Sequence, residues 1–469
     1  MNRDRWQNDE PLSVNPIAHN TRTSRPAAND ANLPWLTLAL GLFFMASGLL
    51  LRKSWREVSE ANERAQNEGL IYCPLAPIEK FSVPEPNQSD AILGCFPNSD
   101  GAWRNGNHWC PPTEHVIHKN PAVHAAVTEG LDWLAAQQSE YGSWEVNALG
   151  KKRDGDNTSP TEEVGNVGAT SLALLAFLGD GSTTKKGKYR AVVQRAVKWL
   201  GQQQDVISGL IETENEELSA IDHGIASLAL AENYYDSHNP FQKLQVQRAL
   251  RYIEYSQNLD GGWHQEKPCR EALDTLLASW NILALVSGAD TRLHTNPHVL
   301  EQGLAWLDAH TDSDTGRIGL NSSITRNPLN SEGGISATMR SATMTRAGWL
   351  AKIMADRPVE SHSLIDLRAD QLLNALPAWS SDGSVDMCGW FLATHIMFQM
   401  AGEHWERWNK ALEQTLLPHQ SMGETLRGSW PPMRSFGMHG GRVQSTALAL
   451  LALQVSYRHL RVIELAPEH

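Results

Sequence analysis

The sequence predicts an all-α fold, an α/α toroid of about six helical hairpins with an inner and an outer ring of helices. Two observations predict it. A phrase recurs in which a small and an apolar residue precede an aromatic–aliphatic pair, a Gln and a Gly-bearing turn. Each copy is followed by a segment of small and apolar residues. A helix that is apolar on every side must be buried on every side. The clearest copies cover 130–144, 196–209 and 249–263, and looser copies begin at 303 and 411.

Composition narrows the class of protein. The chain of 469 residues is long enough for one large repeat domain or two ordinary ones, and the repeats favour one. Its 53 acidic and 40 basic residues give a formal charge of -13, and no block of Lys and Arg alternates with aromatic residues. We therefore expect no nucleic-acid partner.

The cysteines do not indicate a disulfide framework or a zinc knuckle, because they are few, scattered and without C-x2-C spacing. A bridge among the first three stays possible if that part of the chain lies outside the cytoplasm. The five cysteines are Cys73, Cys95, Cys110, Cys269 and Cys388.

The amino-terminal part of the chain predicts a membrane anchor. Residues 1–33 are polar and without apolar period, which is typical of a disordered tail. Residues 34–52 contain an uncharged apolar run with Trp35 at one end and Arg52 at the other, and we interpret them as one transmembrane helix. A buried core helix and a cleaved signal peptide are the alternatives. The charges closest to the span favour a cytoplasmic carboxyl-terminal domain by a slight margin.

Residues 53–120 carry Pro and Cys without sustained periodicity, so we expect a linker or a strap that lies on the domain. The repeat domain covers 121–460. Its repeat-phrase helices carry charged residues on one face and should form the outer ring. The wholly apolar segments should form the inner ring: Ala169–Leu178, Gly224–Ala231, Leu273–Leu285, Met344–Met354, Gly389–Met400 and Thr446–Val455.

The turn residues have a structural interpretation in this geometry. The Trp of each turn should pack its indole against the preceding helix. The Gln side chain can donate to backbone carbonyls at the helix end and so join neighbouring hairpins.

The phrase Gln…Gly-x-Trp resembles the QW repeat of the squalene cyclase and protein prenyltransferase superfamily, over about residues 120–460. Within it the chain looks most like bacterial membrane-anchored prenyltransferase/squalene-oxidase-repeat proteins of unassigned role. The segments 390–399 and 440–447 carry this closer likeness. The resemblance implies a toroid that binds an isoprenoid or lipid-like ligand, whereas the reaction stays open because one fold houses several chemistries.

Cyclase chemistry in the resembled family uses an acid on an Asp-x-Asp-Asp motif, which this chain lacks. Its nearest string is Asp312-Ser313-Asp314-Thr315, in a turn where Asp, Ser and Thr are ordinary turn formers. Class I terpene chemistry would need an Asp-rich, metal-bearing helix that faces a diphosphate, and no inner segment offers one.

Zinc-dependent prenyl transfer would use Asp-x-Cys on one inner helix and His on the next. Asp386 and Cys388 match the first part, but Ser445 occupies the expected His position, so that His439 in the preceding loop would have to complete the site. The alternative is that Asp386 caps its helix and Cys388 packs as a small apolar residue.

Parallel inner helices would gather their amino ends at one end of the ring, where positive helix ends and Arg side chains suit a polar or anionic head group. Trp residues, Trp349 among them, would form an apolar wall. Taken singly, each polar candidate fits a cap or a structural ion pair better than a site residue, and it is their convergence that suggests a site. The candidates are His223, Asp274 and Asp386 for catalysis, and Arg340, Arg346, Arg442, Trp280, Trp390 and His439 for ligand binding.

Three hypotheses follow. The first is the membrane-tethered toroid with a lipid-like ligand, with or without chemistry. The second is a non-catalytic scaffold that recognises a protein through its rim. The third, glycan processing by Glu271 or Asp274 together with Asp386, fits least, because the repeat phrase does not belong to such barrels.

Overall fold

The computed structural model describes residues 96–97, 103–104, 120–146, 165–212, 219–263, 274–313, 315–318, 337–355, 369–380, 385–400, 402–432 and 441–458. All of them belong to Glu85–His469, one of the two units into which the chain divides. The predicted tail at 1–33, the predicted transmembrane helix at 34–52 and nearly all of the linker at 53–120 lie outside the described residues.

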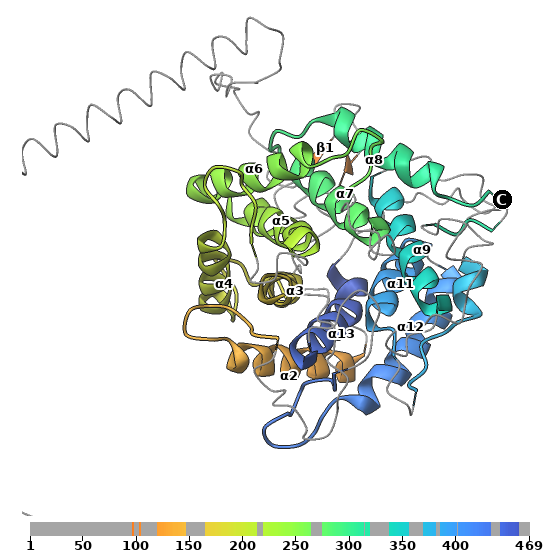
Figure 1. The fold of residues 1–469 in the computed structure, drawn as a ribbon. Coiled ribbons are helices and arrows are strands. Elements are labelled where there is room, and N and C mark those ends of the chain that lie inside the picture. The colour runs from red at the N-terminus through yellow and green to blue at the C-terminus, as the bar shows by residue number, and fades with distance from the viewer. Residues whose placement is uncertain are drawn as a thin grey trace, which may run out of the picture. The chain divides into compact units, whose positions relative to one another are not determined.

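Six helices form a closed inner ring (Figure 1). Each contacts the next, and the last contacts the first, so the prediction of an α/α toroid is confirmed. In chain order they are α3 (Asn166–Gly179), α5 (Ser219–Ser237), α7 (Asp274–Asp290), α9 (Ala337–Met354), α11 (Met387–Met400) and α13 (Gly441–Arg458).

The outer ring alternates with the inner one along the chain (Figure 1). Three of its helices begin with an Asn cap followed by Pro, and the Asn side chain accepts from a backbone N–H of the first turn. The outer helices are α2 (Pro121–Gln137), α4 (Arg190–Gln202), α6 (Pro240–Tyr255), α8 (Pro297–Ala309) and α12 (Gly402–Leu416), with a short helical segment at 369–373 and the 3-10 helix η4 (Leu417–His419).

Burial separates the two rings as their composition predicts. Every residue of α11 is buried, as are all residues of α3 after its first. By contrast, α4 buries a single stripe of apolar residues and exposes its charged face.

The Gln residues join neighbouring hairpins, as the sequence predicts. In four turns the Gln Nε2 donates to the carbonyl of the Gly of its own turn and to a carbonyl of the following outer helix, at 2.8–3.1 Å. The last of these bonds runs from Gln420 to Ala126 in α2, so it closes the ring. The four residues are Gln138, Gln204, Gln257 and Gln420.

The turn tryptophans bond the helix that precedes them. The indole N–H donates at 2.8 Å to a carbonyl of that outer helix, and each ring is buried. These residues are Trp144, Trp263 and Trp430, and each has the structural role that the sequence predicts.

Two short strands form a feature that the sequence does not predict. Strand β1 (Phe96–Pro97) pairs antiparallel with β2 (Trp103–Arg104). Among the helices that the structure describes, none combines the length and the apolar composition needed to cross a bilayer.

Candidate functional site

The inner helices run parallel, and their amino ends meet. At the start of α3 and α5, the backbone N–H of Gly165 donates to the carboxylate of Asp222 at 3.0 Å. At the other end, Gln454 of α13 donates to the carbonyl of Ala176 in α3. The amino ends of neighbouring inner helices therefore lie together, and so do their carboxyl ends, as the predicted site requires.

The strongest polar cluster at the amino ends is centred on Asp386. One carboxylate oxygen, Oδ1, accepts from the backbone N–H of Gly389 and caps α11, at 2.8 Å. The other, Oδ2, accepts from Thr343 Oγ1 and from Arg346 Nη1, both on α9 and both at 2.8 Å. The side chains of Arg346 and Asp386 are each only 8% exposed. Two of the predicted residues are thus brought together as a buried, charge-balanced pair.

Gly389 is required by this pair. A Cβ at this position would collide with the Asp386 carboxylate and with Arg346 Nη1. The lack of a side chain therefore lets the guanidinium lie directly over the first turn of α11.

An aromatic floor lies inside the ring next to this cluster. Trp280 of α7 stacks on Phe391 of α11, with ring centroids 6.4 Å apart and an angle of 11° between the planes. Since α9 separates these two helices in the ring, the pair meets on its inner side. His395 contacts the edge of Phe391 at 4.9 Å, and Trp390 lies 6.5 Å from Trp379. Rings from α7 and α11 thus meet on the inner side of the ring.

Two buried N–H donors beside the floor lack a hydrogen-bond partner among the described residues. They are Trp280 Nε1 and Arg346 Nε, on the neighbouring helices α7 and α9. A buried donor without a partner costs about 1–3 kcal/mol, and folded proteins rarely keep one without a reason.

His223 does not join the cluster. Its Nδ1 accepts from the backbone N–H of Ile211, and its Nε2 donates to the carbonyl of Ala249 in α6, both at 3.0 Å. The ring also contacts Tyr252 of α6 edge-on. Burial lowers the pKa of His223 to about 4, which keeps the imidazole neutral. Its contacts therefore give it a structural role against the outer ring.

The remaining candidates are dispersed. Arg442 donates to Ser421 and Ser429, which flank the last turn, and burial lowers its pKa. Asp274 begins α7 and is half-buried. The side chain of Arg340, and all of Glu271 and His439, lie outside the described residues.

The donor set around Asp386 does not fit zinc in the described part of the chain. Both oxygens of Asp386 already accept from the protein, and Cys388 is wholly buried. No group of three His, Cys, Asp or Glu side chains in that part could hold a metal ion. A zinc site stays a prediction that depends on His439.

The nearest string to a cyclase acid motif is part of a turn. Asp312 Oδ1 accepts from both the backbone N–H and the hydroxyl of Thr315, at 2.8 Å. This is the local bonding that makes Asp a turn former.

Sequence reasoning missed Thr343, Gly389 and Phe391 as members of the cluster. Gly389 carries no capping signal of its own, because any residue there except Pro can donate its N–H to Asp386. No local signal links Thr343 to Asp386, since they lie on different helices.

No protein-family model matches the chain, and no curated protein matches it significantly. Among solved structures it is similar to a sugar epimerase from a ruminal bacterium, with 12% identity and a TM-score of 0.49 over 72% of this chain and 98% of the other. It is also similar to an α-1,6-mannanase of Salegentibacter sp. HEL1_6, with 6% identity and a TM-score of 0.47 over 71% and 99%. A type II terpene cyclase from Scytonema gives 13% identity and a TM-score of 0.45 over 72% and 97%. Likenesses this distant assign no activity, and the architecture rests on the helices of this chain.

Proposed function

We propose that this toroid binds an amphipathic, lipid-like ligand at the amino ends of its inner helices. The observation that carries the proposal is the pair of buried donors, Arg346 Nε and Trp280 Nε1, beside an aromatic floor. A polar or anionic head group would accept from both donors and lie near the positive helix ends. The apolar part would pack on Trp280 and Phe391.

The proposal favours binding over acid catalysis. Asp386 directs its two oxygens to Gly389, Thr343 and Arg346, so its chemistry serves the fold and the placement of the guanidinium. The chain also lacks the Asp-x-Asp-Asp acid. Anchoring through residues 34–52, with the toroid on the cytoplasmic side, would keep the protein near a supply of lipid.

Lipid retention tests the proposal. Full-length protein is purified in mild detergent, and amphiphiles in its organic extract are identified by mass spectrometry. Arg346→Lys keeps a cation for Asp386 but removes the Nε donor, and Trp280→Phe keeps an aromatic ring but removes the indole N–H. We expect each variant to retain about tenfold less amphiphile, because each loses one hydrogen bond to the head group.

Trp408→Phe is the matched control. Its indole N–H donates to Thr394 Oγ1 at 2.9 Å, so the same chemical change is made at a donor that already has a partner. Retention should match the unchanged protein. Equal retention in all three variants, or no amphiphile above a blank purification, would refute the proposal.

A second candidate function, a scaffold for a protein partner, is favoured by the tips of the Gln-bearing turns. Between the Gln and the Gly of each turn stands a largely exposed apolar residue, although turns ordinarily carry polar residues and Gly there. Ile207 is 92% exposed and Leu259 is fully exposed. The full set is Tyr141, Val206, Ile207, Leu259 and Met422.

These tips share one rim of the toroid, because each turn leads from an outer helix toward the amino end of an inner one. We infer that these residues, repeated along one rim, together form an interaction surface. A photoreactive residue at Ile207 or Leu259, in cells that make the protein, should give discrete crosslinked products. The same residue at Lys410, an exposed position of α12, should give none.

A further inference from the structure

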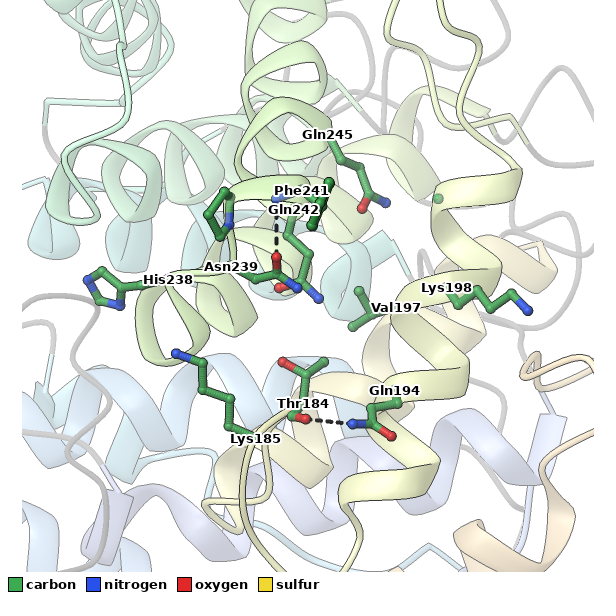
Figure 2. A pocket seen from close by; sticks show the side chains of 12 residues that line it. Thr184, Lys185, Gln194, Val197, Lys198, His238, Asn239, Phe241, Gln242 and Gln245 are labelled. Atoms are coloured by element: carbon green, nitrogen blue, oxygen red, sulfur yellow. Dashed lines mark hydrogen bonds between the residues drawn. The ribbon is translucent and has the colours of Figure 1, made fainter. Parts of the chain in front are cut away.

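A groove of about 490 Å³ lies on the outer wall between α4 and α6 (Figure 2). Its ends are formed by the α3–α4 loop with Thr184 and Lys185, and by the α5–α6 turn with His238. Both connections leave the carboxyl ends of inner helices. The groove therefore lies on the outer wall and reaches the carboxyl ends of the inner helices, so it is a separate feature from the Arg346–Asp386 cluster inside the ring.

The groove has apolar contact surface. Val197 of α4 is buried at its base, whereas Phe241, in the first turn of α6, is 90% exposed. Asn239 caps α6 by accepting from the N–H of Phe241 at 3.1 Å, which fixes this turn (Figure 2). A large, exposed aromatic ring on a fixed helix start can contact an apolar side chain of a partner.

Two lysines give the groove a positive charge in an acidic protein. Lys185 and Lys198 line it and are exposed, and neither forms an ion pair with a residue that the structure describes. In contrast, Lys188 in the same loop is paired with Asp132 at 2.6 Å. In Figure 2, Lys185 reaches toward His238 and Asn239 across the groove, while Lys198 projects from α4 away from the other labelled side chains.

Polar atoms of the wall also lack partners. Thr184 Oγ1 and Gln245 Nε2 are buried without a hydrogen-bond partner in the described part of the chain. The backbone of Gln245 is fixed, because its carbonyl accepts from Gln204 Nε2 at 3.0 Å. Its amide lies over Gly201, where a Cβ would approach Nε2 to 3.0 Å. The amide of Gln242 is oriented by bonds from Asn233 and Ser237 to its Oε1.

The geometry points to a docking site for an acidic peptide segment with an apolar residue. The lysines would pair with Asp or Glu carboxylates, the amides of Gln242 and Gln245 would bond the peptide backbone, and Phe241 would contact the apolar side chain. A groove open along two helices suits an extended or helical segment of another protein. This inference does not depend on the ligand proposed for the inside of the ring.

A random peptide library displayed on phage tests the site. Full-length protein is the bait, and the double variant Lys185→Glu, Lys198→Glu is used for counter-selection. The enriched peptides should combine acidic residues with an apolar one. Measured by fluorescence anisotropy, their affinity should fall at least about tenfold in the double variant and should weaken with added salt. Gln245→Leu, which keeps the backbone bond to Gln204, should weaken binding as well.

Lys410→Glu, at an exposed lysine on the distant helix α12, is the control for charge reversal and should bind as the unchanged protein does. Peptides without an acidic excess, or acidic peptides that bind the double variant equally well, would overturn the inference. So would a selection that yields no peptide while polygalacturonate fragments bind in a manner that requires Lys185, because the ligand class would then be an acidic glycan.

Discussion

Two kinds of turn join the outer helices to the inner ring, and comparing them separates structural from functional residues. The turns after α2 and α12 carry a Trp where the turns after α4 and α8 carry an Ile. In all four, the backbone N–H at this position donates to a side chain of the following inner helix. The pairs are Trp144 with Thr170, Trp430 with Thr446, Ile211 with His223, and Ile318 with Thr345.

His223 thus occupies a Thr position of the repeat. Its Nδ1 accepts the backbone bond that a Thr hydroxyl accepts elsewhere, and its Nε2 donates to the carbonyl of Ala249 in α6. The position that follows teaches the opposite lesson. The other three inner helices have small residues there, Ser171, Gly224 and Ala447, whereas α9 has Arg346. The repeat accounts for the histidine and does not account for the arginine. For this reason the proposed site is centred on Arg346.

The largest expected effect comes from removing the indole of a turn that carries Trp. Trp430→Ala should lower the free energy of unfolding by about 3–5 kcal/mol, because it leaves a cavity where the ring closes and removes the indole bond to Leu416. Urea unfolding of the full-length chain, followed by far-ultraviolet circular dichroism, measures the loss.

Trp199→Ala is the comparison for that measurement. Trp199 lies on α4 and is only half-buried, so its removal should cost clearly less. An equal loss in both variants would contradict the view that the turn tryptophans hold the ring together.

The architecture could be predicted because it is written in local patterns. A segment such as 169–178, apolar on every side, belongs to an inner helix whatever it contacts, and an Asn-Pro pair such as Asn239-Pro240 marks a helix start. The site could be predicted in part. Asp386 and Arg346 were both candidates, but their pairing joins two helices and depends on register. The side-chain type of His223 predicts a catalytic group, whereas its alignment with Thr170 and Thr446 indicates a place in the repeat. The strands β1 and β2 are too short to leave a pattern.

In the turn after α4, which carries Ile211 and bonds His223, the free energy of unfolding should depend on pH. Burial lowers the pKa of His223 from 6.5 to about 4. Between these values the unfolded chain binds a proton that the folded chain does not, so the free energy of unfolding falls as the pH falls. The contribution is about 1.4 kcal/mol for each pH unit, or about 3 kcal/mol over the window.

His223→Thr introduces the residue type that Thr170 and Thr446 have at the equivalent position. It should remove this pH dependence. At neutral pH the variant should be less stable, since Ala249 loses its donor, and the two unfolding curves should approach each other as the pH falls. His298→Thr, at an exposed histidine of α8, should leave the pH dependence intact. Parallel profiles for the original chain and the His223 variant would show that the imidazole is not held neutral.

The smallest effect concerns a feature that the Gln-bearing turns share. Gln138 and Gln420 each donate to two carbonyls, but Gln420 is only 9% exposed, whereas Gln138 is half-buried. Substituting Leu removes both bonds, and at position 138 it also removes the exposed bonds from Arg195 to Oε1. Water can replace the lost donor at the first position, while at the second the carbonyls of Ala126 and Gly428 are left buried without it. We therefore expect a loss of about 2 kcal/mol for Gln420→Leu and about 1 kcal/mol for Gln138→Leu in urea unfolding. Because Gln420 also joins the last hairpin to α2, Gln420→Leu should in addition speed amide exchange in α2. If Gln420→Leu unfolds no more readily than Gln138→Leu, the closure of the ring rests on the apolar contacts alone.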